Sequence, residues 1–145
     1  MAEILYQYLN KAFDGQSSAD KDIRWLTEED YDIFVQHLAL CGQKPISVEV
    51  WENICRKGIP YCGLFKDGTM IARACREIIT PDQWEIADVR VVKDYRNQGY
   101  AYRICSFVLS FILEEGKRPT IRTEEDNFAM QKVIDKLGFT KCKSS

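Results

Sequence analysis

The sequence predicts a mixed α/β fold (α+β in its segregation of elements), with helices on both faces of a central mixed sheet. Three observations predict this fold. Apolar residues recur at helical spacing before residue 57, strand-like runs follow one another from residue 60 to residue 92, and helix-like and strand-like segments alternate after that. The 145 residues suit one domain with one core.

The elements can be placed one by one from Ile23. Thr27 and Asp30 have the spacing of a capping box at the start of the first helix, and Ser47 is a suitable N-cap for the second. Strands are predicted over 23–26, 60–65, 70–79, 84–92 and 119–122 and from 139 onward, and helices over 28–40, 47–56, 100–115 and 127–137. The predicted order is therefore β-α-α-β-β-β-α-β-α-β.

The N-terminal segment is predicted to lie outside this domain. Apolar residues at positions 4, 5, 8, 9 and 13 have helical spacing, which predicts a short amphipathic helix over 3–13. The polar residues 14–20 then form a loop. The chain accordingly divides into an N-terminal helix and loop over 1–20 and a main domain over 21–145.

Charge, hydropathy and cysteine usage exclude several classes of function. The net charge of -2 and the scattered Lys and Arg residues argue against a nucleic-acid partner, and no apolar run approaches the ~20 residues of a membrane span. Six cysteines without a CxxC pair, most of them among apolar neighbours, favour reduced core thiols in the cytoplasm over three disulfides. The single histidine, His37, has no Cys/His cluster around it, so no metal site is predicted.

The segment after the predicted central strand has the properties of an anion site. The strand ends in Val89-x-Val91, and Arg96-Asn97-Gln98-Gly99-Tyr100-Ala101 then leads into a long helix. Free amides at a helix N-terminus favour an anion, Gly99 allows close approach of the backbone, and Arg96 adds a positive charge. These features predict a diphosphate site, the alternative being an ordinary strand-to-helix turn with a surface arginine.

Two blocks of sequence resemble a known family. Arg96-x-x-Gly99-x-Ala101 after Val89-x-Val91 is similar to the coenzyme A signature of the GNAT acetyltransferases, and the stretch from Asn127 to Gly138-Phe139 resembles a later helix of that family. The order of elements from Ile23 to Phe139 agrees with both blocks. The resemblance implies a GNAT-like central sheet that is splayed after the strand ending at Val91.

The same resemblance implies acetyl-CoA as acyl donor and a set of residues that hold it. The backbone of Val89 and Val91 would pair with the pantetheine arm, the amides of residues 98–101 with Arg96 would bind the pyrophosphate, and Asn127 would contact the cofactor. For Asn127 the alternative is a helix N-cap, and both roles are compatible. The predicted cofactor-binding residues are Val89, Val91, Arg96, Asn97, Gln98, Gly99, Tyr100, Ala101 and Asn127.

Glu85 is the predicted catalytic base. It lies six residues before Val91, and an even spacing along a strand predicts that both side chains share one face. Some protein-lysine acetyltransferases of the family carry a catalytic Glu at the place that Glu85 resembles. The alternative is a solvated glutamate at the start of the strand, and Asp88, on the opposite face by parity, is a weaker candidate.

Two departures from the family pattern bear on catalysis. Many members have a Tyr seven residues after the Asn as general acid, whereas this chain has Ile134, which leaves Tyr95, Tyr102 or water to protonate the thiolate. Only six residues follow Phe139, which is room for one strand rather than the usual terminal hairpin. The acceptor cleft is then more open or is completed by a partner subunit in a homodimer, and the loop 40–46 would carry acceptor specificity.

The predicted function is that of an N-acetyltransferase, which moves an acetyl group from acetyl-CoA to a primary amine of a small molecule or peptide. The alternative is a coenzyme A-binding module with little or no catalysis and a regulatory or partner-binding role. Ile134 favours the module, whereas Glu85 and the Arg96 loop favour the enzyme.

Overall fold

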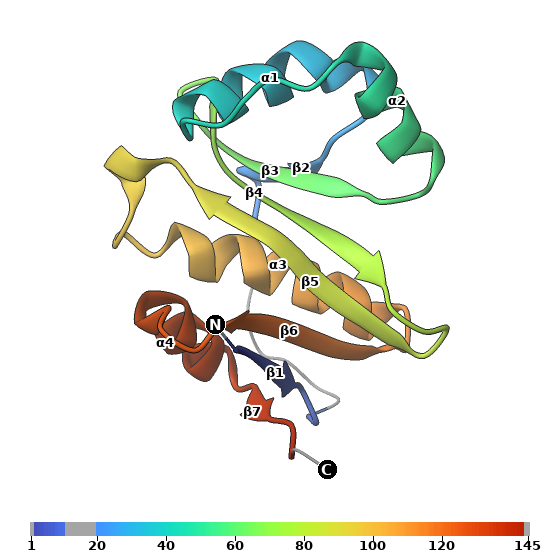
Figure 1. Cartoon of the computed structure of the whole chain (residues 1–145), viewed down its shortest axis with the longest axis vertical. Helices are drawn as coiled ribbons and strands as arrows, with labels where there is room; N and C mark the ends of the chain where they lie inside the picture. Colours follow the sequence, from blue (N-terminus) through green and yellow to red (C-terminus); the bar gives the residue numbers. More distant parts are fainter. Residues whose placement is uncertain (1, 11–19, 144–145) are drawn as a thin grey trace.

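The protein contains a seven-stranded sheet, and the computed structural model describes residues 2–10 and 20–143. Figure 1 shows the strands in the spatial order β2-β3-β4-β5-β6-β1-β7. The strands are β1 (Glu3–Gln7), β2 (Ile23–Trp25), β3 (Tyr61–Lys66), β4 (Thr69–Ile78), β5 (Gln83–Val91), β6 (Arg118–Glu124) and β7 (Thr140–Lys141). The helices are α1 (Tyr31–Leu40), α2 (Val48–Arg56), α3 (Tyr100–Glu114) and α4 (Phe128–Leu137), with 3-10 turns η2 (Glu28–Asp30) and η3 (Lys93–Tyr95).

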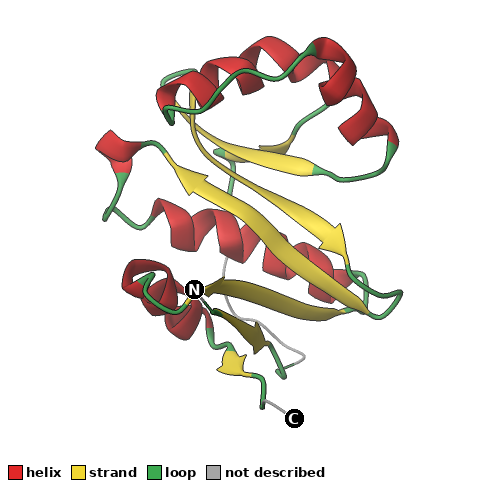
Figure 2. Ribbon diagram, viewed as in Figure 1, coloured by secondary structure: helices red, strands yellow, loops and turns green. Residues whose placement is uncertain are grey.

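The predicted mixed fold with two helical layers is confirmed. From Ile23 to Lys141 the elements follow the predicted order, and β5 runs parallel to β6 while the other described pairs are antiparallel. The pair α1 and α2 lies over β2–β4, and α3 packs on the opposite side of the sheet (Figures 1 and 2). Each layer has its own apolar core, one built on α3 and α4 and the other around Phe34 and Trp51.

The predicted N-terminal helix over 3–13 is wrong. Residues 3–7 form strand β1, which pairs with β6 from Glu3↔Glu124 to Gln7↔Thr120 and also with β7. The apolar residues of this segment fit both the period of a helix and the two-residue period of a strand. The structure follows the strand period: Ile4, Tyr6 and Tyr8 alternate along the chain, and both tyrosines are buried in the core. The last residues of that predicted helix and residues 14–19 of the predicted loop lie outside the described residues.

Strand β1 also supplies the neighbour that the short C-terminus lacks. The family pattern implies a terminal hairpin, but the described residues after α4 form the two-residue strand β7 and no second strand. An antiparallel partner of β7 is nevertheless present, because β1 lies between β6 and β7 and pairs Tyr6 with Lys141. Strands β1 and β7 thus pair with each other on this side of the sheet.

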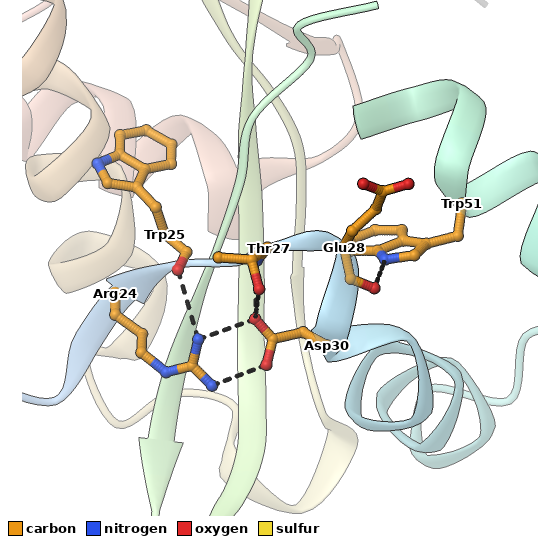
Figure 3. A network of polar contacts seen from close by, with 6 residues as sticks. All are labelled: Arg24, Trp25, Thr27, Glu28, Asp30 and Trp51. Atoms are coloured by element: carbon orange, nitrogen blue, oxygen red, sulfur yellow. Dashed lines mark hydrogen bonds and ion pairs between the residues drawn. The ribbon is translucent and has the colours of Figure 1, made fainter. Parts of the chain in front are cut away.

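The α1–α2 layer is joined to the edge of the sheet by a polar network (Figure 3). Arg24 of β2 donates two hydrogen bonds to the carboxylate of Asp30, at 2.9 and 3.0 Å, and these bonds lower the pKa of Asp30. Asp30 also accepts from the amide of Thr27 at 2.7 Å, which confirms the predicted capping box. Trp51 donates from Nε1 to the carbonyl of Glu28, so α2 is tied to the same turn.

The cysteines are thiols, as their spacing predicts. All six are free, and Cys62, Cys75 and Cys105 are buried within the sheet and α3. Burial raises the pKa of both Cys75 and Cys105 to about 12, so these thiols stay protonated and have little nucleophilic character. Their role is packing.

Candidate active site

The strands β5 and β6 separate after the pair Ile86↔Ile121. The parallel pairing runs from Gln83↔Arg118 to Ile86↔Ile121 and stops there. Beyond it β6 continues to Glu124 beside β1, whereas β5 continues to Val91 beside β4 alone. The second half of β5 therefore has one edge without a strand partner, which is the splay that the family resemblance implied.

A cavity of about 590 Å³ lies at this opening. Its walls come from the end of β5, the loop that follows, the first turn of α3 and the first turns of α4. Eight of the nine predicted cofactor-binding residues line it, namely Val89, Val91, Arg96, Asn97, Gly99, Tyr100, Ala101 and Asn127. The ninth, Gln98, is exposed beside it and donates from Nε2 to the carbonyl of Asp94. Sequence reasoning thus located residues that the fold brings together.

The loop before α3 presents backbone amides to this cavity. Gly99 is the N-cap of α3 with φ 88°, a left-handed conformation that favours glycine. The first hydrogen bond of the helix joins the amide of Arg103 to the carbonyl of Gly99, so the amides of residues 100–102 precede any intrahelical bond. Arg96 donates from Nε to the carbonyl of Val91, which holds its exposed guanidinium at the rim. The charge and the free donors suit a phosphate group.

Asn127 serves as the N-cap of α4. Its Oδ1 accepts a hydrogen bond from the amide of Met130 at 3.1 Å, so the helix-capping alternative is confirmed. The residue also lines the cavity, which keeps a second role toward a bound molecule geometrically available.

Glu85 is buried in an ion pair at the base of the opening. Its side chain is 6% exposed, and both carboxylate oxygens accept hydrogen bonds from Arg122 of β6, at 2.9 and 3.1 Å. Oε1 also accepts from the hydroxyl of Thr120. The alternative of a solvated glutamate is therefore wrong. Glu85 is not among the residues that line the cavity.

The prediction that Glu85 and Val91 share one face is also wrong, because β5 contains a bulge. Cys75 of β4 faces Ala87, but Arg73, two residues earlier, faces Arg90, so β5 has one extra residue in between. Asp88 lies within this interval and has φ 49°. The bulge reverses the alternation, so Val91 shares the α3 core with Ile86, the neighbour of Glu85.

Asp88 is held on the side of the sheet that faces α1 and α2. Its carboxylate accepts two hydrogen bonds from Arg73, both at 3.1 Å, and one from the hydroxyl of Tyr61 at 2.7 Å. Sequence reasoning did not select Tyr61 or Arg73. The signal was present for Arg73, which stands in the otherwise apolar run from Met70 to Cys75 and is 2% exposed.

Both tyrosines that the sequence offers as a general acid lie at the cavity. Ile134 is fully buried in the core and offers no hydroxyl, as the sequence shows. Tyr95 and Tyr102 both line the cavity. The ring of Tyr102 lies 4.5 Å from Nζ of Lys136, and Tyr95 stacks edge-on with Tyr100. Which of these groups, or water, protonates a leaving thiolate stays a prediction.

His37 is a core residue of α1. It is completely buried, and its Nδ1 lies 3.0 Å from the carbonyl oxygen of Met70, with Nε2 3.6 Å from Sγ of Cys41. A carbonyl can only accept, so Nδ1 carries the proton and Nε2 accepts from the thiol. Burial lowers the pKa of His37 from 6.5 to about 4, and the positive charge of Arg73 acts in the same direction.

The buried imidazole predicts an acid-sensitive fold. Between pH 6.5 and about 4 the unfolded chain binds a proton that the folded His37 does not. The free energy of unfolding should therefore fall as the pH decreases through this window, by up to about 3 kcal/mol from this group. Urea denaturation of the parent and of His37→Gln, which keeps a donor for Met70, measures the difference. Parallel pH profiles for the two proteins would contradict the assignment.

Among the described residues, no group of three or more His, Cys, Asp or Glu side chains is placed to hold a metal ion. None of the helices within residues 2–10 and 20–143 is both long enough and apolar enough to cross a bilayer.

Comparison with solved structures finds the same fold in several acetyltransferases. A GNAT-family acetyltransferase of Colwellia psychrerythraea matches with a TM-score of 0.80 at 21% identity, over 97% of this chain and 52% of that one. The ribosomal-protein-S18-alanine N-acetyltransferase of Escherichia coli matches with a TM-score of 0.68 at 18% identity, over 83% and 78% of the two chains. An aminoglycoside N-acetyltransferase in complex with CoA matches with a TM-score of 0.68 at 18% identity, over 86% and 95%.

These identities show a shared fold, and the chain spans only about half the length of the Colwellia protein. No curated protein matches the chain in sequence. The model of the acetyltransferase (GNAT) family, however, matches residues 5–139, a range that contains the opened strand, the Arg96–Ala101 loop and α4. The chain therefore belongs to the acetyltransferase (GNAT) family.

Proposed function

We propose that this protein transfers an acetyl group from acetyl-CoA to a primary amine of a small molecule or a peptide. The observation that carries the proposal is the cavity between β5 and α4, where an unpaired strand edge lies beside the first amides of α3. The arm of the cofactor would lie along Val89 and Val91, as an added strand does. The diphosphate would lie against residues 96–101, where an ideal Cβ on Gly99 meets nothing within 4 Å, so there is room for it.

The chemistry requires that the amine lose a proton. Acetyl-CoA, as a substrate, brings a thioester carbonyl, and the amine nitrogen bonds to that carbon as the carbon–sulfur bond breaks. A lysine-like amine has a pKa near ~10.4, so only about one molecule in ~2,000 is neutral at pH 7. A positioned proton acceptor contributes on the order of 10²–10⁴ in rate. The departing thiolate needs less help, since a thiol has a pKa of roughly 8.5.

Glu85 is the proton acceptor that we propose. It lies on β5 one residue before the last β5–β6 pair, directly below the opening. The helices α1 and α2 lie over β2–β4 rather than over this part of the sheet (Figure 1). Because Arg122 occupies both of its oxygens, Glu85 would act through a water molecule or with Arg122 displaced by the substrate.

The names of two of the three relatives support the proposed class of acceptor. One is an aminoglycoside N-acetyltransferase and the other a ribosomal-protein-S18-alanine N-acetyltransferase, and an acceptor with a primary amine is consistent with both names. We propose that the loop 40–46, which follows α1, selects between such acceptors. Strand β1 pairs with both β6 and β7, and a homodimer would serve acceptor binding. The free thiols support our proposal that the protein acts in the cytoplasm.

A second candidate is a coenzyme A-binding module without catalysis. Ile134 favours it, because the helix that carries a general acid in many family members offers a buried methyl group here. Both candidates predict binding of CoA, and they differ only in turnover.

Product analysis separates the two. The purified protein is incubated with acetyl-CoA and a panel of primary amines that contains an aminoglycoside, a polyamine and a peptide with a free N-terminal alanine. Mass spectrometry should show an acetylated amine and free CoA in equal amounts. Tight binding of CoA without any acetylated amine would favour the binding module, and absence of CoA binding would exclude both.

A further inference from the structure

The bulge in β5 separates two parts of the strand with different tasks. Up to Ile86 the strand pairs with β6, and from Val89 onward it borders the cavity. Asp88 lies between the two parts with φ 49°, a left-handed conformation that is unfavourable for residues other than glycine, although Asp tolerates it better than most. Without the extra residue, Val89 and Val91 would turn to the other face of the sheet. The position of the bulge thus decides what the strand presents to the cavity.

The carboxylate that holds this conformation is fixed from two neighbouring strands. Arg73 of β4 contributes Nε and a terminal nitrogen, and Tyr61 of β3 contributes its hydroxyl. Burial raises the pKa of Tyr61, so the phenol remains a donor. Arg73 lies against the ring of Phe34 of α1, 5.9 Å from its centroid, and Tyr61 packs edge-on against the same ring. The three polar groups therefore connect β5 to β4, β3 and the α1 layer.

A buried arginine is a poor means of adding stability. Apolar residues of similar size often stabilise a protein as much as a buried ion pair does, whereas loss of one partner leaves an uncompensated charge. Arg73 is 2% exposed at its side chain while Asp88 is 39% exposed, so the desolvation falls mainly on the arginine. What the pair provides, and an apolar pair would not, is one fixed direction for the backbone at Asp88.

We propose that Tyr61, Arg73 and Asp88 form a clamp that fixes the bulge of β5 and so sets the opening in which the arm of acyl-CoA binds. The inference rests on the proposed function. The three residues are positioning residues, because they act through the backbone of Val89 and Val91 and none of them lines the cavity.

The test compares the affinity for CoA across a small set of variants. Arg73→Met removes the clamp without leaving a buried charge, and we expect CoA to bind roughly 10 to 100 times more weakly in calorimetry, because the two charge-assisted hydrogen bonds that fix the bulge are lost. Asp88→Asn keeps a side chain that tolerates the left-handed conformation and one acceptor oxygen for Arg73, but it loses the charge, so it should weaken CoA binding by less than Arg73→Met does.

Arg24→Met is the matched control. Arg24 makes the same two-bond contact with an aspartate, Asp30, at the far edge of the sheet (Figure 3), so its loss should leave CoA affinity unchanged. If Arg73→Met does not fold, Arg73→Lys keeps the charge and loses the forked geometry, and a loss of several-fold is then expected.

Steady-state kinetics distinguish the clamp from a contact with the acceptor. The clamp predicts a raised KM for acetyl-CoA and an unchanged KM for the amine in Arg73→Met. Parental affinity for CoA in that variant, or a change confined to the KM of the amine, would overturn the clamp while leaving the proposed function in place. Failure of the parent protein itself to bind CoA would overturn both.

Discussion

Replacing Gly99 by glutamate is expected to abolish the binding of CoA and acetyl-CoA. The N-cap of α3 has φ 88°, and its ideal Cβ meets nothing within 4 Å, so the new side chain fits sterically but extends into the space proposed for the diphosphate. Its negative charge would occupy the region where the amides of residues 100–102 and the positive end of the helix dipole favour an anion. Calorimetry with CoA should show affinity reduced by roughly 100-fold or more.

Two variants separate charge and position from backbone strain. Gly116, at the other end of α3, has φ 72° and equally open surroundings, so Gly116→Glu introduces the same strain and the same charge away from the cavity. It should lower stability by about 1 kcal/mol and leave CoA affinity unchanged. Gly99→Asn places a neutral residue that tolerates the left-handed region, and it should retain most of the affinity. A folded Gly99→Glu protein that binds CoA as the parent does would remove this loop from the proposed site.

The features that could be predicted from the sequence are those that local patterns determine. The order of elements from Ile23, the capping box of Thr27 and Asp30, and the loop at Gly99 each depend on residues close together in the chain, and each is found as predicted. The loop is informative because the chemistry of a helix N-terminus is local: the amides, the glycine and the arginine all lie within six residues.

What could not be predicted depends on partners distant in the chain. Residues 3–7 form a strand because β6, more than 100 residues away, offers them a paired edge, and their own apolar pattern does not exclude a helix. The face of Glu85 was predicted wrongly because strand parity assumes a regular strand, and the extra residue is visible only in the register against β4. The pairing of Glu85 with Arg122 likewise joins residues of two strands that α3 separates.

Replacing Glu85 by glutamine is expected to lower the rate of acetyl transfer by about 10²-fold at neutral pH, if Glu85 accepts the proton of the amine. The affinity for CoA should barely change, because Glu85 lies outside the cavity that the cofactor would occupy. The deficit should shrink as the pH approaches the pKa of the amine, near ~10.4, since the free amine no longer needs a base. The measurement is a pair of pH–rate profiles for the parent and Glu85→Gln.

The ion pair with Arg122 supplies the control that this prediction needs. Glutamine keeps the size of Glu85 and a carbonyl oxygen for Arg122, but it loses the charge, so some stability is lost whether or not Glu85 is catalytic. Arg122→Gln breaks the same pair and keeps the carboxylate. If the pair is only structural, both variants should lose stability, Arg122→Gln the more because it leaves a buried carboxylate unpaired, and both should keep the parental profile at temperatures where they are folded. If Glu85 is the base, Glu85→Gln alone loses the rate at neutral pH, and superimposable profiles of parent and Glu85→Gln from about pH 6 to about pH 10 would instead leave the reaction to proximity and bulk water.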